Sequence, residues 1–158
     1  MADLDRTQLI YLIALNSAKG LVLQGVDLAG QDLRGLYLAL ANLRLANLEK
    51  ANLNQANLEK AQFEDTNLQY ADLSEANLQG ANLQRANLVG ADLRAADLSY
   101  TDLREADLRS ANLRGAVLNR ANLWHTNLKD ANLVYANIEG AKGLPVEIYE
   151  QLRAKPEG

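Results

Sequence analysis

Residues 41–60 read ANLRLANLEKANLNQANLEK, so an Ala-Asn-Leu triplet returns every five residues. On both sides of this stretch, an apolar residue occupies every fifth position from Leu28 to Ile138 without a gap. We call these 23 positions the centres of the repeats. Two residues before the centre stands Ala in 17 repeats, and directly before it stands Asn or Asp in 20. Such regular internal repetition predicts a structure assembled from five-residue units.

A period of five fits neither a helix nor a straight strand. On an α-helix successive centres would rotate by about 140°, and on a strand they would alternate between the two faces. The local geometry must therefore repeat every five residues, as a short extended piece followed by a turn. We expect a closed coil in which the centre and the residue two before it point inward, and the Asn or Asp points outward. The two residues after the centre form the turn. In six repeats the second of these two residues is glycine, and some turn types need a positive φ at that position.

A single repeat cannot be stable alone. Burying one Leu contributes roughly 1.5–3 kcal/mol, whereas ordering five backbone residues costs roughly 5–10 kcal/mol. Stability must therefore come from stacked coils, and both ends of the stack need a cover. We expect residues 1–26 to form an N-terminal cap with a short helix and the approach to the first coil. Residues 26–141 form the repeat array, and 142–158 form a C-terminal capping helix and tail.

Each expected capping helix has apolar residues that would face the stack. In the first helix, over residues 5–17, these are Leu9, Ile10, Leu12, Ile13 and Leu15. Pro145 suits the start of the second helix. Its apolar residues are Val146, Ile148, Tyr149 and Leu152.

Composition excludes several classes of function. The chain has no Cys and one His, so disulfides, thiolate metal sites and histidine clusters cannot form. A net charge of −4 argues against direct nucleic-acid binding, which normally needs a basic face. The apolar run at residues 9–15 is too short to span a membrane and does not resemble a signal peptide. We therefore expect a cytoplasmic protein that uses no catalytic residues, cofactor or metal and contacts no membrane.

The motif Ala-(Asn/Asp)-Leu-X-X, as in Ala51–Gln55 and Ala106–Ser110, strongly resembles the pentapeptide repeat proteins. The resemblance extends over about 115 of the 158 residues. It implies an all-β solenoid, a right-handed quadrilateral β-helix with four repeats per coil and about six coils. Some members of that family resemble a DNA duplex in shape and charge and bind type II topoisomerases.

Two groups of charged residues are candidates for a partner-binding surface. The first is an acidic group that a duplex mimic would need, formed by Asp97, Asp102, Glu105 and Asp107. The alternative is a solvated surface of mixed charge, because these residues wrap three faces of one coil. The second is the pair Arg94 and Arg114, which stack on one face and would grip an anion or an acidic partner. The alternative is that the pair is neutralised by acidic residues on the same face, which are Asp72, Glu75 and Asp92.

Aromatic residues give a further candidate surface. Trp124 and His125 form an aromatic pair on a turn, where an exposed Trp would anchor a partner. The alternative is a Trp packed flat on its neighbours. His125 has no nucleophile or pocket beside it, so we do not expect it to act as a catalytic base.

The C-terminal helix leaves the oligomeric state open. Ile148, Tyr149 and Leu152 close the last coil of a monomer, or they form a dimer, as the C-terminal end does in some relatives. For function we expect a non-catalytic structural or protein-interaction module that binds an unidentified protein. The alternative is a duplex mimic that binds DNA gyrase or topoisomerase IV.

Overall fold

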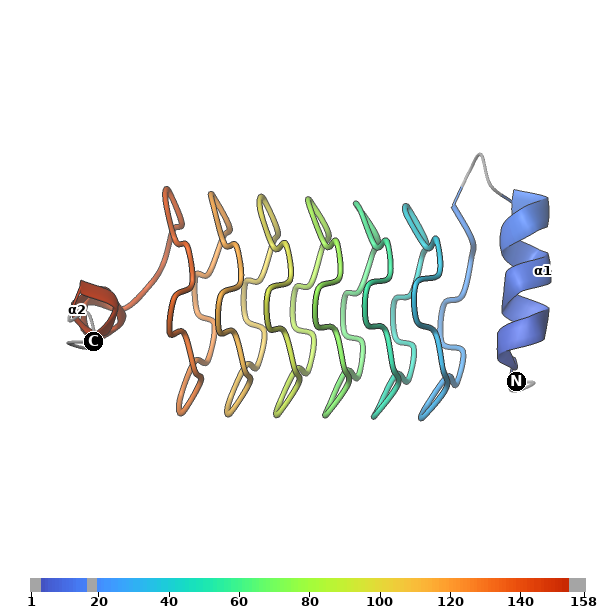
Figure 1. Ribbon diagram of the computed structural model, residues 1–158, viewed down its shortest axis with the longest axis horizontal. Coiled ribbons are helices and arrows are strands. Elements are labelled where there is room, and N and C mark those ends of the chain that lie inside the picture. The colour runs from blue at the N-terminus through green and yellow to red at the C-terminus, as the bar shows by residue number, and fades with distance from the viewer. Residues whose placement is uncertain (1–3, 17–19, 154–158) are drawn as a thin grey trace.

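The computed structural model describes residues 4–16 and 20–153. Two helices, α1 (Arg6–Asn16) and α2 (Val146–Arg153), lie at opposite ends of a stack of coils (Figure 1). Between them the backbone forms isolated parallel bridges, each joining residues 20 positions apart, from Val22↔Asn42 to Asn122↔Lys142. Because one repeat has five residues, each coil holds four repeats. The bridges begin at Val22, one repeat before the first centre that the sequence marks at Leu28.

The interior consists of leucine and alanine. The centres from Leu28 to Leu123 are at most 2% exposed, and this includes Phe63, the bulkiest of them. The residues two positions earlier are also buried, apart from Gln31, whereas the Asn and Asp side chains between them are at least partly exposed. The expected inward and outward positions of the repeat are confirmed.

All five amides of an inner repeat have acceptors, as buried backbone groups require. In repeat 81–85, Ala81 N donates to Leu78 O across the preceding turn (2.9 Å) and Gln84 N donates to Asn82 Oδ1 (3.1 Å). The other three amides donate to neighbouring coils, Asn82 N to Ala61 O (3.0 Å), Leu83 N to Asp102 O (2.7 Å) and Arg85 N to Arg104 O (3.0 Å). The Asn or Asp before each centre therefore closes the turn that follows it.

Every turn places its second residue at positive φ. The glycines at this position behave as expected, for example Gly30 at φ 66° and Gly115 at 70°. However, 17 non-glycine residues adopt the same conformation, with φ between 55° and 62°. In 14 of them the amide donates to the next coil, as Lys60 N does to Gln79 O (2.9 Å). The other three, His125, Asp130 and Tyr135, lie in the last coil and make no such bond within the described residues. Hydrogen bonds between coils thus hold a backbone conformation that the side chain alone disfavours.

Helix α1 begins with reciprocal bonds between Asp5 and Gln8. Gln8 N donates to Asp5 Oδ1 and Asp5 N donates to Gln8 Oε1, both at 2.8 Å, which is a capping box. Leu9 is fully buried, and Leu12 and Ile13 pack against the core at the helical spacing of three and four residues.

The sequence-based assignment of a single apolar side to α1 is wrong for two residues. Ile10 and Leu15 are largely exposed, because they point away from the stack on the outer side of the helix.

The guanidinium of Arg6 covers part of the N-terminal edge of the stack. Its Nη1 donates to Asp32 O (2.8 Å) and its Nη2 to Arg34 O (3.0 Å). One coil later, the equivalent carbonyls of Asn52 and Asn54 accept backbone amides from the preceding coil. One arginine side chain therefore replaces two amides of a missing coil.

Helix α2 follows Pro145, as expected, and Ile148 N donates to Pro145 O (3.1 Å). Ile148, Tyr149 and Leu152 pack against the core of the same chain, and the Tyr149 hydroxyl donates to Ala141 O (3.3 Å). Val146 was expected on this apolar side but is exposed, because it lies on the opposite side of the helix. Across the described residues, neither helix has the length and apolar character needed to cross a bilayer.

Candidate protein-interaction surface

Several charged side chains on the rod form ion pairs within a single repeat. An Asp before the centre pairs with an Arg directly after it, in Asp32–Arg34, Asp92–Arg94, Asp102–Arg104 and Asp107–Arg109. The Arg donates to the carboxylate side chain and the same carboxylate accepts the backbone amide of the Arg, for example at 3.2 Å in Arg104 N to Asp102 Oδ1. The motif Asp-Leu-Arg thus forms a local ion pair.

These contacts lower the pKa of the aspartates. Hydrogen bonds from Arg104 hold the pKa of Asp102 below its ordinary value, against the opposing effect of partial burial. Arg109 lowers the pKa of Asp107 in the same way. Partial burial raises the pKa of Asp92, but the bonds from Arg94 outweigh it and leave that pKa lowered. The aspartates are therefore ionised at neutral pH and their charge is matched.

The acidic candidates divide into two kinds. Asp102 and Asp107 are paired with arginines, whereas within the described residues Asp97 and Glu105 form no ion pair. Asp97 accepts the amide of Ser99 (2.9 Å) and closes its own turn. The structure therefore does not bring the four residues together as a continuous acidic surface.

The basic candidates also divide. Arg94 is paired with Asp92, as the alternative expected. Arg114 follows Asn112 instead of an Asp, and its guanidinium lies over the Tyr135 ring, 5.2 Å from the ring centre. Arg120, which sequence reasoning did not single out, lies over the Tyr100 ring at 5.7 Å. Among the arginine side chains that the structure describes, only these two lack a carboxylate partner.

The two unpaired arginines flank one side of a single coil. Between them lies Val117, which bridges to Asp97 and Asn137 and stands where other repeats have Asn or Asp. Because valine has no acceptor, the turn after it lacks the usual side-chain bond, and Asn119 Oδ1 is buried without a partner. The repeat pattern is thus broken where both cations are unpaired.

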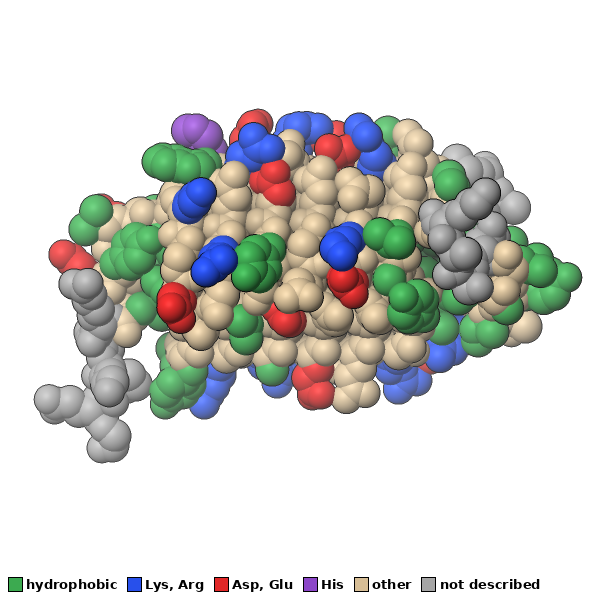
Figure 2. Space-filling view, turned by 90° about the horizontal axis from the view of Figure 1, so that it is seen from above, with side chains coloured by type: hydrophobic (Ala, Val, Ile, Leu, Met, Phe, Trp, Pro, Cys, Tyr) green, Lys and Arg blue, Asp and Glu red, His purple; other side chains and the backbone are tan. Residues whose placement is uncertain are grey.

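We call this region the 114–120 surface, and it comprises Arg114, Val117, Arg120, Tyr100 and Tyr135. Both tyrosines are exposed, Tyr100 by 56% and Tyr135 by 67%. Figure 2 shows one long face of the rod, where separate basic side chains lie beside hydrophobic ones on a largely uncharged surface. A stacked arginine is held in place and still presents its N–H donors to a partner.

Trp124 and His125 lie at the next turn along the chain. Trp124 is 55% exposed, and its ring centre lies 6.3 Å from that of His125 at a tilt of 47°. The two aromatic rings therefore lie together on the surface, at the turn that follows Arg120 in the sequence.

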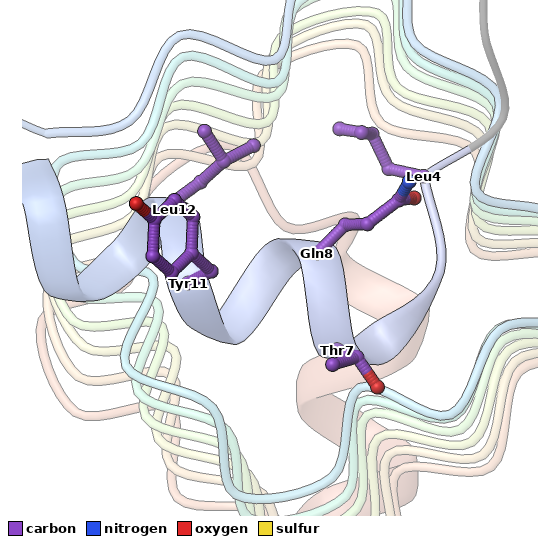
Figure 3. A pocket seen from close by; sticks show the side chains of 5 residues that line it. All are labelled: Leu4, Thr7, Gln8, Tyr11 and Leu12. Carbon is purple, nitrogen blue, oxygen red and sulfur yellow. The ribbon is translucent and has the colours of Figure 1, made fainter.

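Three hollows lined by described residues lie at the ends of the molecule. Figure 3 shows α1 lying across the end of the coil stack, with a shallow hollow on the helix lined by Leu4, Thr7, Gln8, Tyr11 and Leu12. Two grooves flank α2 at the other end. In the described part of the chain, no three side chains of His, Asp or Glu are grouped so that they would hold a metal ion.

Comparison with known sequences identifies the repeat. The sequence model of Pentapeptide repeats matches in eight copies, over residues 22–59, 41–80, 71–109 and 111–142. The chain belongs to the pentapeptide repeat family. The resemblance seen in the motif is confirmed, and the fold of this pentapeptide repeat protein is a right-handed β-helix solenoid. A search of curated proteins found no match.

Several solved structures are similar to this pentapeptide repeat protein. Rfr23 from the cyanobacterium Cyanothece 51142, a pentapeptide repeat protein, is 29% identical with a TM-score of 0.53, over 85% of this chain and 97% of that one. HetL from Nostoc sp. strain PCC 7120, which is involved in heterocyst differentiation regulation, is 35% identical with a TM-score of 0.30, over 78% and 65%. The plasmid-mediated fluoroquinolone resistance protein QnrB1, in a trypsin-treated variant form, is 15% identical with a TM-score of 0.38, over 77% and 72%.

Proposed function

We propose that this pentapeptide repeat protein is a non-catalytic interaction module that binds an acidic segment of a partner protein through the 114–120 surface. The observation that carries the proposal is the isolation of Arg114 and Arg120 from carboxylates. Seven other described arginines have such a partner within 4 Å. An exposed arginine without a carboxylate partner is a site where a partner's carboxylate gains a charge-assisted bond.

The surroundings of the two arginines favour binding. Residues 20 positions apart stack on one another in neighbouring coils, and we call such a set a column. In the column of Arg114 the neighbours are Arg94 and Val134, and in the column of Arg120 they are Tyr100 and Gly140. No carboxylate of the same column therefore competes with a partner. Tyrosine and arginine are also enriched among the residues that dominate interface energies, and tyrosine brings a large contact area at a low cost in conformational entropy.

The rod supplies a rigid base for this surface. The bridges from Val22 to Lys142 correspond to about six coils of 20 residues. We propose that α1 and α2 close the two ends of the stack, which is supported by the burial of Leu9 and by the packing of Ile148, Tyr149 and Leu152 on the core. A solenoid filled with Leu and Ala leaves no cavity inside its shaft for a substrate, which supports a role in binding.

The proposal is tested by fluorescence anisotropy with a labelled decapeptide of alternating Glu and Ala. The test variant is Arg114→Ala/Arg120→Ala. The control is Arg94→Ala/Arg109→Ala, which removes the same charge from two ion-paired arginines. We expect the test variant to weaken binding about tenfold or more, equivalent to about 1.4 kcal/mol, and the control by less than about twofold.

Equal losses in the two variants would show attraction by net charge alone and would contradict a specific surface. No loss in the test variant would also overturn the proposal. Circular dichroism of each variant confirms that the fold is retained.

A second candidate function is a duplex mimic that binds DNA gyrase or topoisomerase IV. It is favoured by the rod shape in Figure 1 and by the net charge of −4. The pairing of Asp102 and Asp107 with arginines weakens it, because those charges are already matched. A supercoiling assay with gyrase, with and without a quinolone, decides the matter, and no effect of excess protein would exclude this candidate.

A further inference from the structure

The outward side of α1 is uncharged, unlike the solvent side of an ordinary surface helix. Its exposed residues are Thr7, Gln8, Ile10, Tyr11, Ala14 and Leu15. Tyr11 is 66% exposed and Leu15 is 64% exposed. The solvent side of a surface helix normally carries charged residues, as α2 does with the exposed Glu147 and Glu150. The outward side of α1 therefore has the character of a face that is covered by another apolar surface.

Four residues on this side follow the spacing of a helix-pairing seam. We call them the α1 seam, and they are Leu4, Thr7, Tyr11 and Ala14. They are separated by three, four and three residues, which is the spacing of the a and d positions in a coiled coil. At 3.6 residues per turn, the seam lies opposite Leu9, which is fully buried against the coils. The seam therefore faces away from the stack, and Figure 1 shows α1 as the outermost described element at this end of the rod.

The α1 seam is complementary to a second copy of itself. Positions 7 and 11, and positions 4 and 14, are each centred on position 9. An antiparallel pair of α1 helices that cross at the level of Leu9 thus places Tyr11 opposite Thr7, and Leu4 opposite Ala14. Each large side chain meets a small one, as knobs-into-holes packing requires. Leu4, Thr7 and Tyr11 also line the hollow of Figure 3, so the seam presents both a cavity and the side chain that fits it.

We propose that the chain pairs with a second copy through the α1 seam, so that two rods join end to end. In this pair the Tyr11 ring of each copy enters the hollow of the other. Helix α1 has 11 residues and is about 16 Å long, so the contact is small. We therefore expect a reversible dimer with a dissociation constant of about 10–100 µM.

A second copy fits this seam better than a charged partner or an anionic lipid surface. A two-fold interface brings the same residues together from both copies, and an uncharged seam allows this without repulsion. A charged partner finds no opposite charge on the seam. Binding to anionic lipids uses Lys or Arg on the helix, but Arg6 already donates to Asp32 O (2.8 Å) and Arg34 O (3.0 Å).

The opposite end of the rod offers no comparable seam. The sequence left open a dimer through the C-terminal helix, but the apolar residues meant for it pack on the core of their own chain, and they are Ile148, Tyr149 and Leu152. The inference is independent of the proposed function, because α1 lies at the far end of the rod from the coil that carries Arg120. Both 114–120 surfaces stay accessible in the pair.

The test measures the mass of the full chain by sedimentation equilibrium over about 5–500 µM. We expect the mass to rise from that of one chain to that of two, and small-angle X-ray scattering should show a particle about twice as long. Thr7→Glu and Tyr11→Lys each place an unpaired charge in the seam and should weaken association about tenfold or more. An equal mixture of the two variants should associate again, because the introduced charges face each other in the antiparallel pair.

The control is Val146→Glu, which adds a charge at an exposed apolar residue of α2. It should associate as the wild type does, and loss of association in this variant would overturn the proposal by placing the interface on α2. A wild type that stays monomeric throughout, a dimer no longer than the monomer, or a mixture that associates no better than either variant alone would also overturn it. The Arg114→Ala/Arg120→Ala variant should dimerise normally, which separates this result from a failure of the proposed function.

Discussion

At the residue scale, each position of the repeat has one physical task. The Asn or Asp before the centre accepts the amide two residues later, as Asn77 Oδ1 does from Gln79 N (3.0 Å), and all 20 such residues make this bond. Asn and Asp are suited to it because their side chains are short enough to reach the nearby backbone. Tyr37, Gln62 and Val117 do not make it, and Val117 lies in the 114–120 surface. The departures from the repeat are therefore the residues to examine for function.

Glycine at the second turn position adopts a positive φ without strain, and at some positions it also leaves room for a neighbouring side chain. Gly30 has φ 66° with no atom within 4 Å of an added Cβ, whereas at Gly90 the Cβ would lie 2.5 Å from Cε1 of Tyr70. We expect Gly30→Ala to lower the free energy of unfolding by about 1 kcal/mol through the backbone alone. Gly90→Ala should lose more, because the Tyr70 ring must also move. Urea unfolding of both variants measures the difference, and an equal or larger loss in Gly30→Ala would contradict this account.

At the element scale, the two ends of the stack are covered by different means. The N-terminal edge is covered by α1 together with the Arg6 guanidinium, which bonds two backbone carbonyls. The C-terminal edge is covered by α2 through side-chain packing, and its backbone amides at Ile138 and Gly140 stay unpaired.

Removal of the Arg6 side chain should loosen α1 from the first coil. We expect Arg6→Ala to lower stability by about 1 kcal/mol, because two charge-assisted bonds to partly exposed carbonyls are lost. Hydrogen exchange of the α1 amides should accelerate at the same time. The matched control is Arg34→Ala, which removes an exposed ion pair with the same Asp32 and should cost no more than about 0.5 kcal/mol. Unchanged exchange in α1 of the Arg6→Ala variant would show that the helix is held by its apolar side alone.

At the scale of the whole molecule, stability is shared between stacked coils and matched surface charges. Each inner coil buries Leu and Ala side chains, and three backbone amides of each of its repeats donate to neighbouring coils. A coil therefore depends on its neighbours for stability. Outside this core, each Asp-Leu-Arg pair is neutral, so the net charge of −4 comes from the other charged residues.

The lowered pKa of Asp102 predicts a pH dependence of stability. A carboxyl whose pKa falls on folding stabilises the protein above its ordinary pKa of 3.8, and that contribution is lost as the pH drops through the folded value. We expect Asp102→Asn, which keeps an Oδ1 acceptor for the turn, to be about 0.5–1 kcal/mol less stable than the wild type at pH 7. The difference should shrink as the pH falls below about 3.8. Denaturant titrations of both proteins between pH 7 and about pH 2.5 measure it, and a gap that stays constant with pH would refute the assignment.

The sequence predicted only part of the candidate site. Arg114 was singled out, but its contact with Tyr135 and the whole Arg120–Tyr100 pair were missed. Both contacts cross from one coil to the next, over 21 and 20 residues. Comparing residues one coil apart would have found Arg120 beside Tyr100, because both occupy the second turn position. The ion pair that removes Arg94 from consideration was foreseen as an alternative, and side-chain geometry decided it.

The sequence alone determined the five-residue unit, its inward-facing residues and the positions of its turns, because a pattern of apolar, small and amide side chains specifies local conformation and inward direction together. The number of four repeats per coil came from the family resemblance. It also placed the two helices within a residue or two. The tertiary structure decided which charges are matched, which side of each helix is free and which backbone groups stay unpaired at the ends. Those properties depend on contacts between coils and on where the stack stops, and neither is encoded within a single repeat.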